Sequence, residues 1–250
     1  MKKLLMALLA CLFLSPVVFA QDFFKLVQSG TPEQVQAAID KGENVNAETQ
    51  GGNSPLMFAA QHNQNAEVIA ILLKAGALVN KNAKVGGMTP LMNAATSNAN
   101  PEVITVLLKA GANVNAVDDY MITSLMHAAK TNPNAEVITI LLKSGAKLDM
   151  RNNTNQTPLM AAAGTNNPEV VTALLKGRAK LNDTDSRGMT ALMWAAAYNQ
   201  NPEVAMTLLK AGANGKLKSS DDKTAFDYAE GNEKLKGTDA YEALRKVAGK

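Results

Sequence analysis

Short apolar stripes recur along the chain at the spacing of one helix face, and polar links separate them. One such stripe follows the positions i, i+1, i+4 and i+5 and comprises Val137, Ile138, Leu141 and Leu142. This spacing predicts an amphipathic helix with a single buried face. A shorter alanine-rich segment at 123–130 precedes the stripe and predicts a second, tightly packed helix. A polar stretch follows, so each unit predicts a helix, a link, a second helix and an extended loop.

The same four-residue pattern marks the start of each unit. Its copies are Ser54-Pro55-Leu56-Met57, Thr89-Pro90-Leu91-Met92, Thr123-Ser124-Leu125-Met126, Thr157-Pro158-Leu159-Met160 and Thr190-Ala191-Leu192-Met193, with a degenerate Thr224-Ala225-Phe226 at the end. The hydroxyl residues of these copies are spaced by 35, 34, 34, 33 and 34 positions. A nearly fixed period of this length predicts a solenoid in which each unit contacts only its neighbours.

Each copy also carries signals for the start and the end of its second helix. The helix begins with an asparagine followed by proline and glutamate in Asn100-Pro101-Glu102 and in two sister copies. Asparagine is a good N-cap, proline fits the first helical position, and an acid there complements the helix dipole. A glycine ends this helix in most copies, but Gly177-Arg178 places arginine at the expected left-handed position. Because the link at 164–169 is also one residue shorter, we expect a local irregularity in this unit.

The assembled pattern closely resembles the ankyrin repeat. It reads Thr-Pro-Leu-x-x-Ala-Ala, followed by Glu-Val-Ile-x-x-Leu-Leu-Lys-x-Gly-Ala-x-Val-Asn-Ala. The resemblance covers about 22–250 and implies an all-α solenoid of about seven helix-turn-helix units with extended loop fingers. It divides the chain into an N-terminal cap at about 22–49, five full repeats at about 50–218 and a C-terminal cap at about 219–250.

One departure from the family pattern is a methionine in each full copy where the family usually has histidine. These residues are Met57, Met92, Met126, Met160 and Met193. A row of thioethers at a fixed period raises the alternative of copper binding or redox sensing. Methionine is also an adaptable side chain that fills interior gaps. We therefore expect this row to pack between repeats.

The N-terminal residues 1–20 have the pattern of a cleavable secretory signal peptide of bacterial type. Two lysines precede an apolar run, a proline breaks it, and small residues lead to an expected cleavage between Ala20 and Gln21. We therefore expect a periplasmic or secreted protein. In an alternative interpretation, residues 8–11 form a lipobox and Cys11 carries a lipid.

Charge and cysteine content narrow the range of partners. The formal net charge is +3, and removal of Lys2 and Lys3 without any acid lowers it to +1. Such a near-neutral chain is not expected to bind nucleic acid or to insert into a membrane after cleavage. Cys11 is the only cysteine, so the mature protein would have no disulfide and no thiolate metal site. We expect a monomer without a cofactor.

Catalytic candidates are few. His62 and His127 are the only two histidines, they lie two repeats apart, and neither has a nucleophile nearby in the sequence. The glycine pairs at 51–52 and 86–87 lack the strand and helix context of a phosphate-binding loop. We therefore expect no enzymatic activity.

The remaining function class is the binding of another protein. The resemblance implies that loop tips and the exposed side of each first helix line a concave groove, where off-pattern residues are candidate contacts. They are Phe58, Tyr120, Met121, His127, Arg187, Trp194 and Tyr198. Tyr, Trp and Arg are enriched among interface hot spots. Packing between repeats is an alternative role for Phe58, Trp194 and His127.

The sequence thus predicts an exported protein-interaction module that binds through a concave groove. It would act as an accessory protein that stabilises an enzyme, or as an inhibitor of a toxin. A lipid-anchored structural protein of the envelope and a secreted effector directed at a host are the alternatives. Fold alone does not name the partner.

Overall fold

The computed structural model of the protein describes the backbone of residues 16–250 and the side chains from residue 22 onward. Over this range the chain forms fourteen α-helices, and its extended backbone pairing is limited to an isolated bridge between Val117 and Thr123. Most of the expected signal peptide, with Cys11, lies outside the described residues. The expected cleavage position after Ala20 falls within the first helix.

The helices alternate between two stacked rows. The odd-numbered row is α1 (Pro16–Ser29), α3 (Pro55–His62), α5 (Pro90–Ser97), α7 (Ser124–Thr131), α9 (Pro158–Thr165), α11 (Ala191–Tyr198) and α13 (Ala225–Ala229). The even-numbered row is α2 (Pro32–Asp40), α4 (Ala66–Lys74), α6 (Pro101–Lys109), α8 (Ala135–Lys143), α10 (Pro168–Lys176), α12 (Pro202–Lys210) and α14 (Asp239–Ala248). The predicted all-α solenoid of about seven helix pairs with loop fingers is confirmed.

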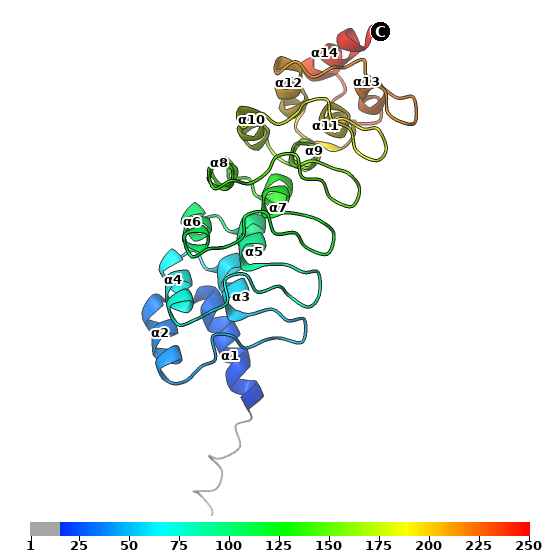
Figure 1. The fold of residues 1–250 in the computed structure, drawn as a ribbon. Coiled ribbons are helices and arrows are strands. Elements are labelled where there is room, and N and C mark those ends of the chain that lie inside the picture. The colour runs from blue at the N-terminus through cyan, green and yellow to red at the C-terminus, as the bar shows by residue number, and fades with distance from the viewer. Residues whose placement is uncertain (1–15) are drawn as a thin grey trace, which may run out of the picture.

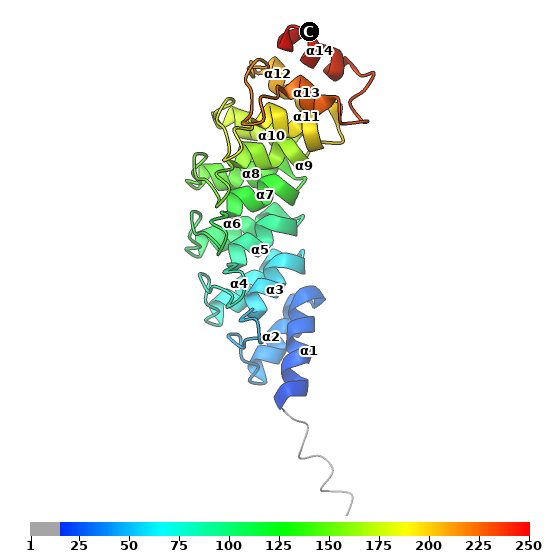
Figure 2. The ribbon, with the colours of Figure 1, turned by 90° about the vertical axis from the view of Figure 1, so that its right-hand side faces the viewer.

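The fingers are the loops that lead from each even-numbered helix to the next odd-numbered helix. They project to the right of the stack in Figure 1, on the side away from the even-numbered helices. Figure 2 looks onto this side and shows the fingers on the left and the odd-numbered helices on the right. The fingers and the odd-numbered row together therefore form one long face, which we call the finger face.

The helix starts follow the capping pattern of the sequence. The Thr123 hydroxyl accepts a hydrogen bond from the Met126 N–H at 3.2 Å, and the Asn134 side chain accepts one from the Glu136 N–H at 2.9 Å. In three units the methionine sulfur also accepts the N–H of the cap residue, as Met92 Sδ does from Thr89 at 3.4 Å. All five methionines of the row are buried, with at most 4% of the residue exposed. The expected interior role of the row is confirmed.

Buried asparagines join each unit to the preceding one. The amide of Asn98 donates to the carbonyl oxygens of Ala60 at 2.8 Å and Asn63 at 3.0 Å. Asn132 repeats this arrangement on Ala95 and Asn98 at 3.2 and 3.1 Å. The same pair of bonds recurs in every link, and the donors are Asn63, Asn98, Asn132, Asn166, Asn199 and Asn232. We call this row the asparagine ladder. It satisfies buried carbonyls that the ends of the odd-numbered helices leave free.

The fifth unit differs from the others in its second helix. Helix α10 starts at Pro168, eleven residues after Thr157, whereas α8 starts twelve residues after Thr123. A Cβ at Gly177 would lie 2.8 Å from Leu142 Cδ1, and Arg178 takes the left-handed position with φ 72°. The glycine thus stands where two helices approach closely, and the expected irregularity at this junction is confirmed.

Candidate protein-binding surface

The large apolar side chains that remain exposed are concentrated on the finger face. Among the described residues they are Leu78 (57%), Val85 (75%), Tyr120 (63%), Met121 (44%) and Tyr198 (47%). Val85, Tyr120 and Met121 lie at fingertips, and Tyr198 ends the odd-numbered helix α11. Leu78 belongs to the same finger as Val85 but lies at its base, four residues after the end of α4 at Lys74. The exposed apolar side chains are therefore unevenly distributed over the molecule.

A carboxylate shapes the finger of the fourth unit. Asp118 Oδ1 accepts the backbone N–H groups of Tyr120 and Ile122, both at 2.8 Å. Its second oxygen lies 2.9 Å from Nε2 of His127 on α7. The fingertip is thus fixed to the helix, and it presents Tyr120 and Met121 to solvent. Met121 adopts φ 60°, so it occupies a left-handed position as Gly87 does in the preceding finger.

His127 is mostly enclosed by this arrangement, with 16% of its side chain exposed. Burial lowers the pKa of His127 below its ordinary value of 6.5, although the hydrogen bond to Asp118 acts in the opposite direction. A neutral imidazole that donates from Nε2 fits this site. The structure therefore places His127 in a role that positions the finger.

The finger of the sixth unit uses the same design with larger side chains. Asp185 Oδ1 accepts the N–H groups of Arg187 and Met189, both at 2.9 Å. Its second oxygen accepts the indole N–H of Trp194 at 3.0 Å. The Arg187 guanidinium lies 4.9 Å from the centre of the Trp194 ring, and the Trp194 and Tyr198 rings are 5.0 Å apart. We call Asp185, Arg187, Trp194 and Tyr198 the Arg187 cluster.

The structure thus sorts the seven sequence candidates into three groups. Arg187, Trp194 and Tyr198 contact one another directly, while Tyr120, Met121 and His127 share the finger held by Asp118. Phe58 stands apart: it is half-buried and packs edge-on against Phe24 of the first unit at 5.3 Å. With about 8–10 Å between packed helices, the second, fourth and sixth units lie roughly 20 Å apart.

Sequence reasoning missed the two aspartates that organise these fingers. Asp118 and Asp185 occupy the same position of the repeat, five residues before Thr123 and Thr190. Both are buried, with 6% of the residue exposed. The signal that would have found them is a recurrent acid at a position where other copies have Thr49, Asn152 or Ser219, which also bond their own finger backbone.

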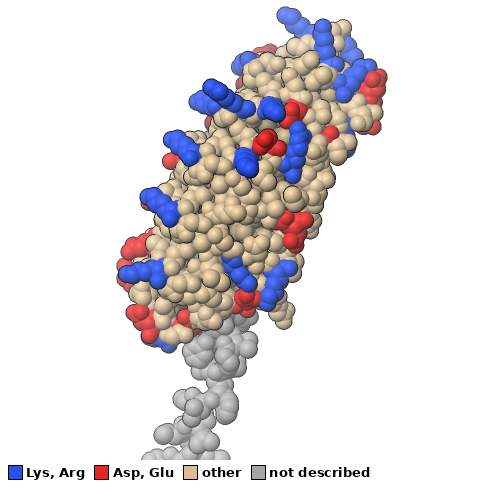
Figure 3. Space-filling model, in the orientation of Figure 1, with Lys and Arg blue, Asp and Glu red and all other residues tan. Residues whose placement is uncertain are grey.

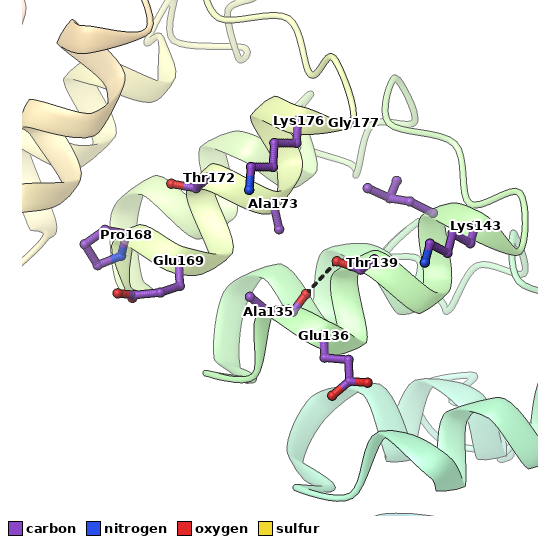
Figure 4. Close-up of a pocket in the computed structure, with 11 residues that line it drawn as sticks. Ala135, Glu136, Thr139, Lys143, Pro168, Glu169, Thr172, Ala173, Lys176 and Gly177 are labelled. Atoms are coloured by element: carbon purple, nitrogen blue, oxygen red, sulfur yellow. Dashed lines mark hydrogen bonds between the residues drawn. The ribbon is translucent and has the colours of Figure 1, made fainter.

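A separate groove lies between α8 and α10, outside the finger face. It has a volume of about 660 Å³, and its lining includes small or apolar side chains such as Ala135, Leu142 and Ala173. Figure 4 shows Glu136 and Glu169 toward one end and Lys143 and Lys176 toward the other. None of the seven sequence candidates lines this groove.

The surface charges are dispersed. Acidic and basic side chains are scattered over the face shown in Figure 3, with wide uncharged areas between them. Within residues 16–250, no helix is long and apolar enough to cross a membrane. No cluster of three or more metal-binding side chains occurs in this part of the chain.

Comparisons with known proteins agree with the architecture. Residues 23–118 and 123–235 match the family described as "Ankyrin repeats (3 copies)". The crystal structure of the human ASB11 ankyrin repeat domain matches with a TM-score of 0.77 and 27% identity, over 93% of this chain and 97% of that one. In all, 544 chains of solved structures match, so the fold by itself selects no partner. No curated protein matches the chain. The family match spans most of the sequence, and the chain therefore belongs to the ankyrin-repeat family.

Proposed function

We propose that the protein is an exported interaction module that binds a partner protein through its finger face. The observation that carries this proposal is the location of the exposed aromatic and arginine side chains. Tyr120, Arg187 and Tyr198 all project from fingers or from an odd-numbered helix, and tyrosine and arginine are enriched at interface hot spots. Ankyrin repeats in general serve as protein-interaction modules, which supports the same conclusion.

The fingers support this function because their conformation is set before any partner binds. Each fingertip is closed by hydrogen bonds to its own backbone, and neighbouring fingers are joined by backbone bonds such as Asn153 N–H to Tyr120 O at 3.2 Å. The side chains at the tips are therefore held at a fixed spacing. A preorganised surface loses little conformational entropy on association, which favours affinity.

Export is the second part of the proposal, and it depends on residues 1–20. Their charged start, apolar run and small residues before Gln21 are typical of a signal peptide. The function is then that of a periplasmic or secreted accessory protein or inhibitor. Lipid anchoring at Cys11 is the competing arrangement, and it would make the protein a component of the envelope surface.

Affinity capture tests the binding surface. The bait is the mature chain, incubated with periplasmic extract, and the test variant carries Tyr120→Ala and Tyr198→Ala. The matched control is Leu78→Ala, which also truncates an exposed apolar side chain but lies at the base of a finger, directly after α4 and away from the fingertips. Wild type and control should recover the same partner, while the double variant recovers much less of it. Equal recovery by all three proteins would refute the finger face as the binding surface.

Intact mass spectrometry tests export separately. A mature chain that starts at Gln21 without added lipid supports the proposed signal peptide. A chain that starts at Cys11 with added acyl mass would instead establish the lipid-anchored alternative.

A further inference from the structure

We propose that the Arg187 cluster is a receptor for a carboxylate side chain of the bound partner segment. This inference rests on the proposed function and specifies the chemistry of the partner at one position. The other four candidate residues are Phe58, Tyr120, Met121 and His127, which provide apolar or neutral polar contacts, whereas this cluster presents a charged group on the finger face.

The first step concerns the negative charge inside the cluster. Both oxygens of Asp185 are already used by N–H donors of this chain, at 2.9–3.0 Å. The carboxylate is also enclosed, with 2% of its side chain exposed. Arg187 Nε and Asp185 Oδ2 form a loose ion pair at 3.8 Å, which is too long for a hydrogen bond. The aspartate therefore builds the finger, and it leaves the donors of Arg187 largely free.

The second step concerns the position of the guanidinium. It lies over the Trp194 ring at 4.9 Å, and a hydrogen bond with Tyr198 raises the pKa of Arg187. Its side chain is nevertheless 51% exposed. Stacking on Trp194 restricts the long side chain before binding, so less rotamer entropy remains to be lost. A fixed planar fork of N–H donors matches the two oxygens of a carboxylate.

The third step concerns the neighbouring charges. In the next unit, Lys223 Nζ lies 5.7 Å from the centre of the Tyr228 ring, so a second cation stands over the aromatic side chain of that unit. Asp222, on the same finger, is paired with Lys218 at 2.8 Å. Within 218–223, Lys218 and Lys223 balance Asp222 and the exposed Asp221, so the net exposed charge at the cluster is that of Arg187. It complements an acidic residue of a partner and disfavours a basic one.

The fourth unit provides an internal contrast. There His127 takes the place of Trp194, and Tyr120 takes the place of Arg187, so the same finger design carries no fixed cation. Of these two fingers, only that of the sixth unit is therefore expected to recognise a carboxylate. The partner segment would place Asp or Glu on Arg187 and an apolar side chain against the exposed edges of Trp194 and Tyr198.

The chain provides its own reporter, because Trp194 is its only tryptophan. The probe is the pentapeptide Ala-Leu-Glu-Leu-Ala, acetylated and amidated so that its only charge is the glutamate. Titration is followed by tryptophan fluorescence at low salt, against the matched peptide with Gln in place of Glu and against sodium acetate. We expect the Glu peptide to bind at least about tenfold more tightly than the Gln peptide.

Variants locate the effect. Arg187→Gln should abolish the preference for the Glu peptide, and Arg187→Lys should retain only part of it because the planar fork is lost. Arg178→Gln is the matched control, since it removes the same formal charge from an exposed arginine outside the cluster. Circular dichroism should show that all three variants keep the helical fold.

Several results would overturn the proposal. These are equal binding of the Glu and Gln peptides, no binding of either, an undiminished preference in Arg187→Gln, or an equal response to acetate, which would indicate a site for small anions. Partner capture separates this failure from that of the proposed function. If Arg187→Gln still captures the partner while the Tyr120→Ala/Tyr198→Ala variant does not, the carboxylate receptor is wrong and the finger face stands.

Discussion

The side-chain amide of Asn132 donates a hydrogen bond to the backbone carbonyl of Asn98, the equivalent residue of the preceding unit, at 3.1 Å. The same amide also donates to Ala95 O, and its oxygen accepts the Asn134 N–H at 3.0 Å. One asparagine thus satisfies two carbonyls of one unit and orders the link of the next. Repeated along the stack, this contact ties the units together at positions that water does not reach.

Replacing one member of the asparagine ladder should therefore lower the stability of the folded protein. Asn132→Ala leaves two buried carbonyls without a donor, and we expect the free energy of unfolding to fall by about 3 kcal/mol. Urea denaturation followed by circular dichroism measures the loss. The matched control is Asn80→Ala, which removes a similar pair of bonds to Gly111 O and Asn113 N in an exposed loop. It should cost only about 1 kcal/mol. Equal losses would show that burial of the ladder is not the source of its strength.

Ser124 offers a stabilising substitution. Its hydroxyl is fully buried and has no hydrogen-bond partner, at a position where three sister copies have Pro55, Pro90 and Pro158. Ser124→Ala removes the unsatisfied group and should raise the free energy of unfolding by about 1 kcal/mol. Ser124→Pro should add several tenths more, because proline restricts the unfolded chain and suits the first helical position. A thermal melt that shows both variants below wild type would contradict this account.

The junction after α10 predicts opposite effects at two adjacent residues. Arg178→Gly relieves the left-handed backbone of a non-glycine residue and should stabilise the protein by about 1 kcal/mol. Gly177→Ala should destabilise it, because the new Cβ would meet Leu142 Cδ1 at 2.8 Å and the Leu174 carbonyl oxygen at 3.2 Å. Denaturation midpoints of the two single variants measure both effects. If Gly177→Ala stabilised the protein instead, the close contact between position 177 and Leu142 would not be the reason for the glycine.

The buried histidine predicts a pH dependence of stability. Because burial lowers the pKa of His127 in the folded protein below 6.5, the unfolded chain binds the proton more readily. The free energy of unfolding should therefore fall as the pH drops from about 7 through the ordinary histidine pKa of about 6.5 toward the lower folded value. His127→Gln should flatten this slope.

Denaturation in urea at a series of pH values between 7 and 5 checks the effect. The exposed His62→Gln variant serves as the control and should keep the slope of the wild type. If His127→Gln and wild type lose stability in parallel, the imidazole is not the group responsible.

Much of the architecture could be predicted from local pattern. Helix α8 follows from its apolar stripe and from the Asn134 cap, and the left-handed arginine follows from the inverted order of Gly177 and Arg178. Of the candidate surface, the unusual residues Tyr120 and Tyr198 could be selected because they break the repeat at positions that the family exposes. The helix signals and the off-pattern residues each lie within one copy of the repeat, where residue spacing and backbone preference are sufficient for a prediction.

The connections between copies could not be predicted in the same way. In the sequence, Asn98 and Asn132 have the pattern of turn-forming residues in a polar link. Nothing in that pattern indicates that their amides are buried against carbonyls 34–38 positions earlier. Asp185 likewise reads as an ordinary loop acid until the finger folds back and brings it to the indole of Trp194.

The sequence by itself determined the period of this protein, its helices and the apolar side of each helix, because these depend on residue spacing and on local backbone preference. The tertiary structure alone decided which polar side chains hold the stack together and which project from it. That choice depends on the distance and orientation between neighbouring units. A hydrogen bond is made or lost within a few tenths of an ångström, a precision that only the packed stack provides.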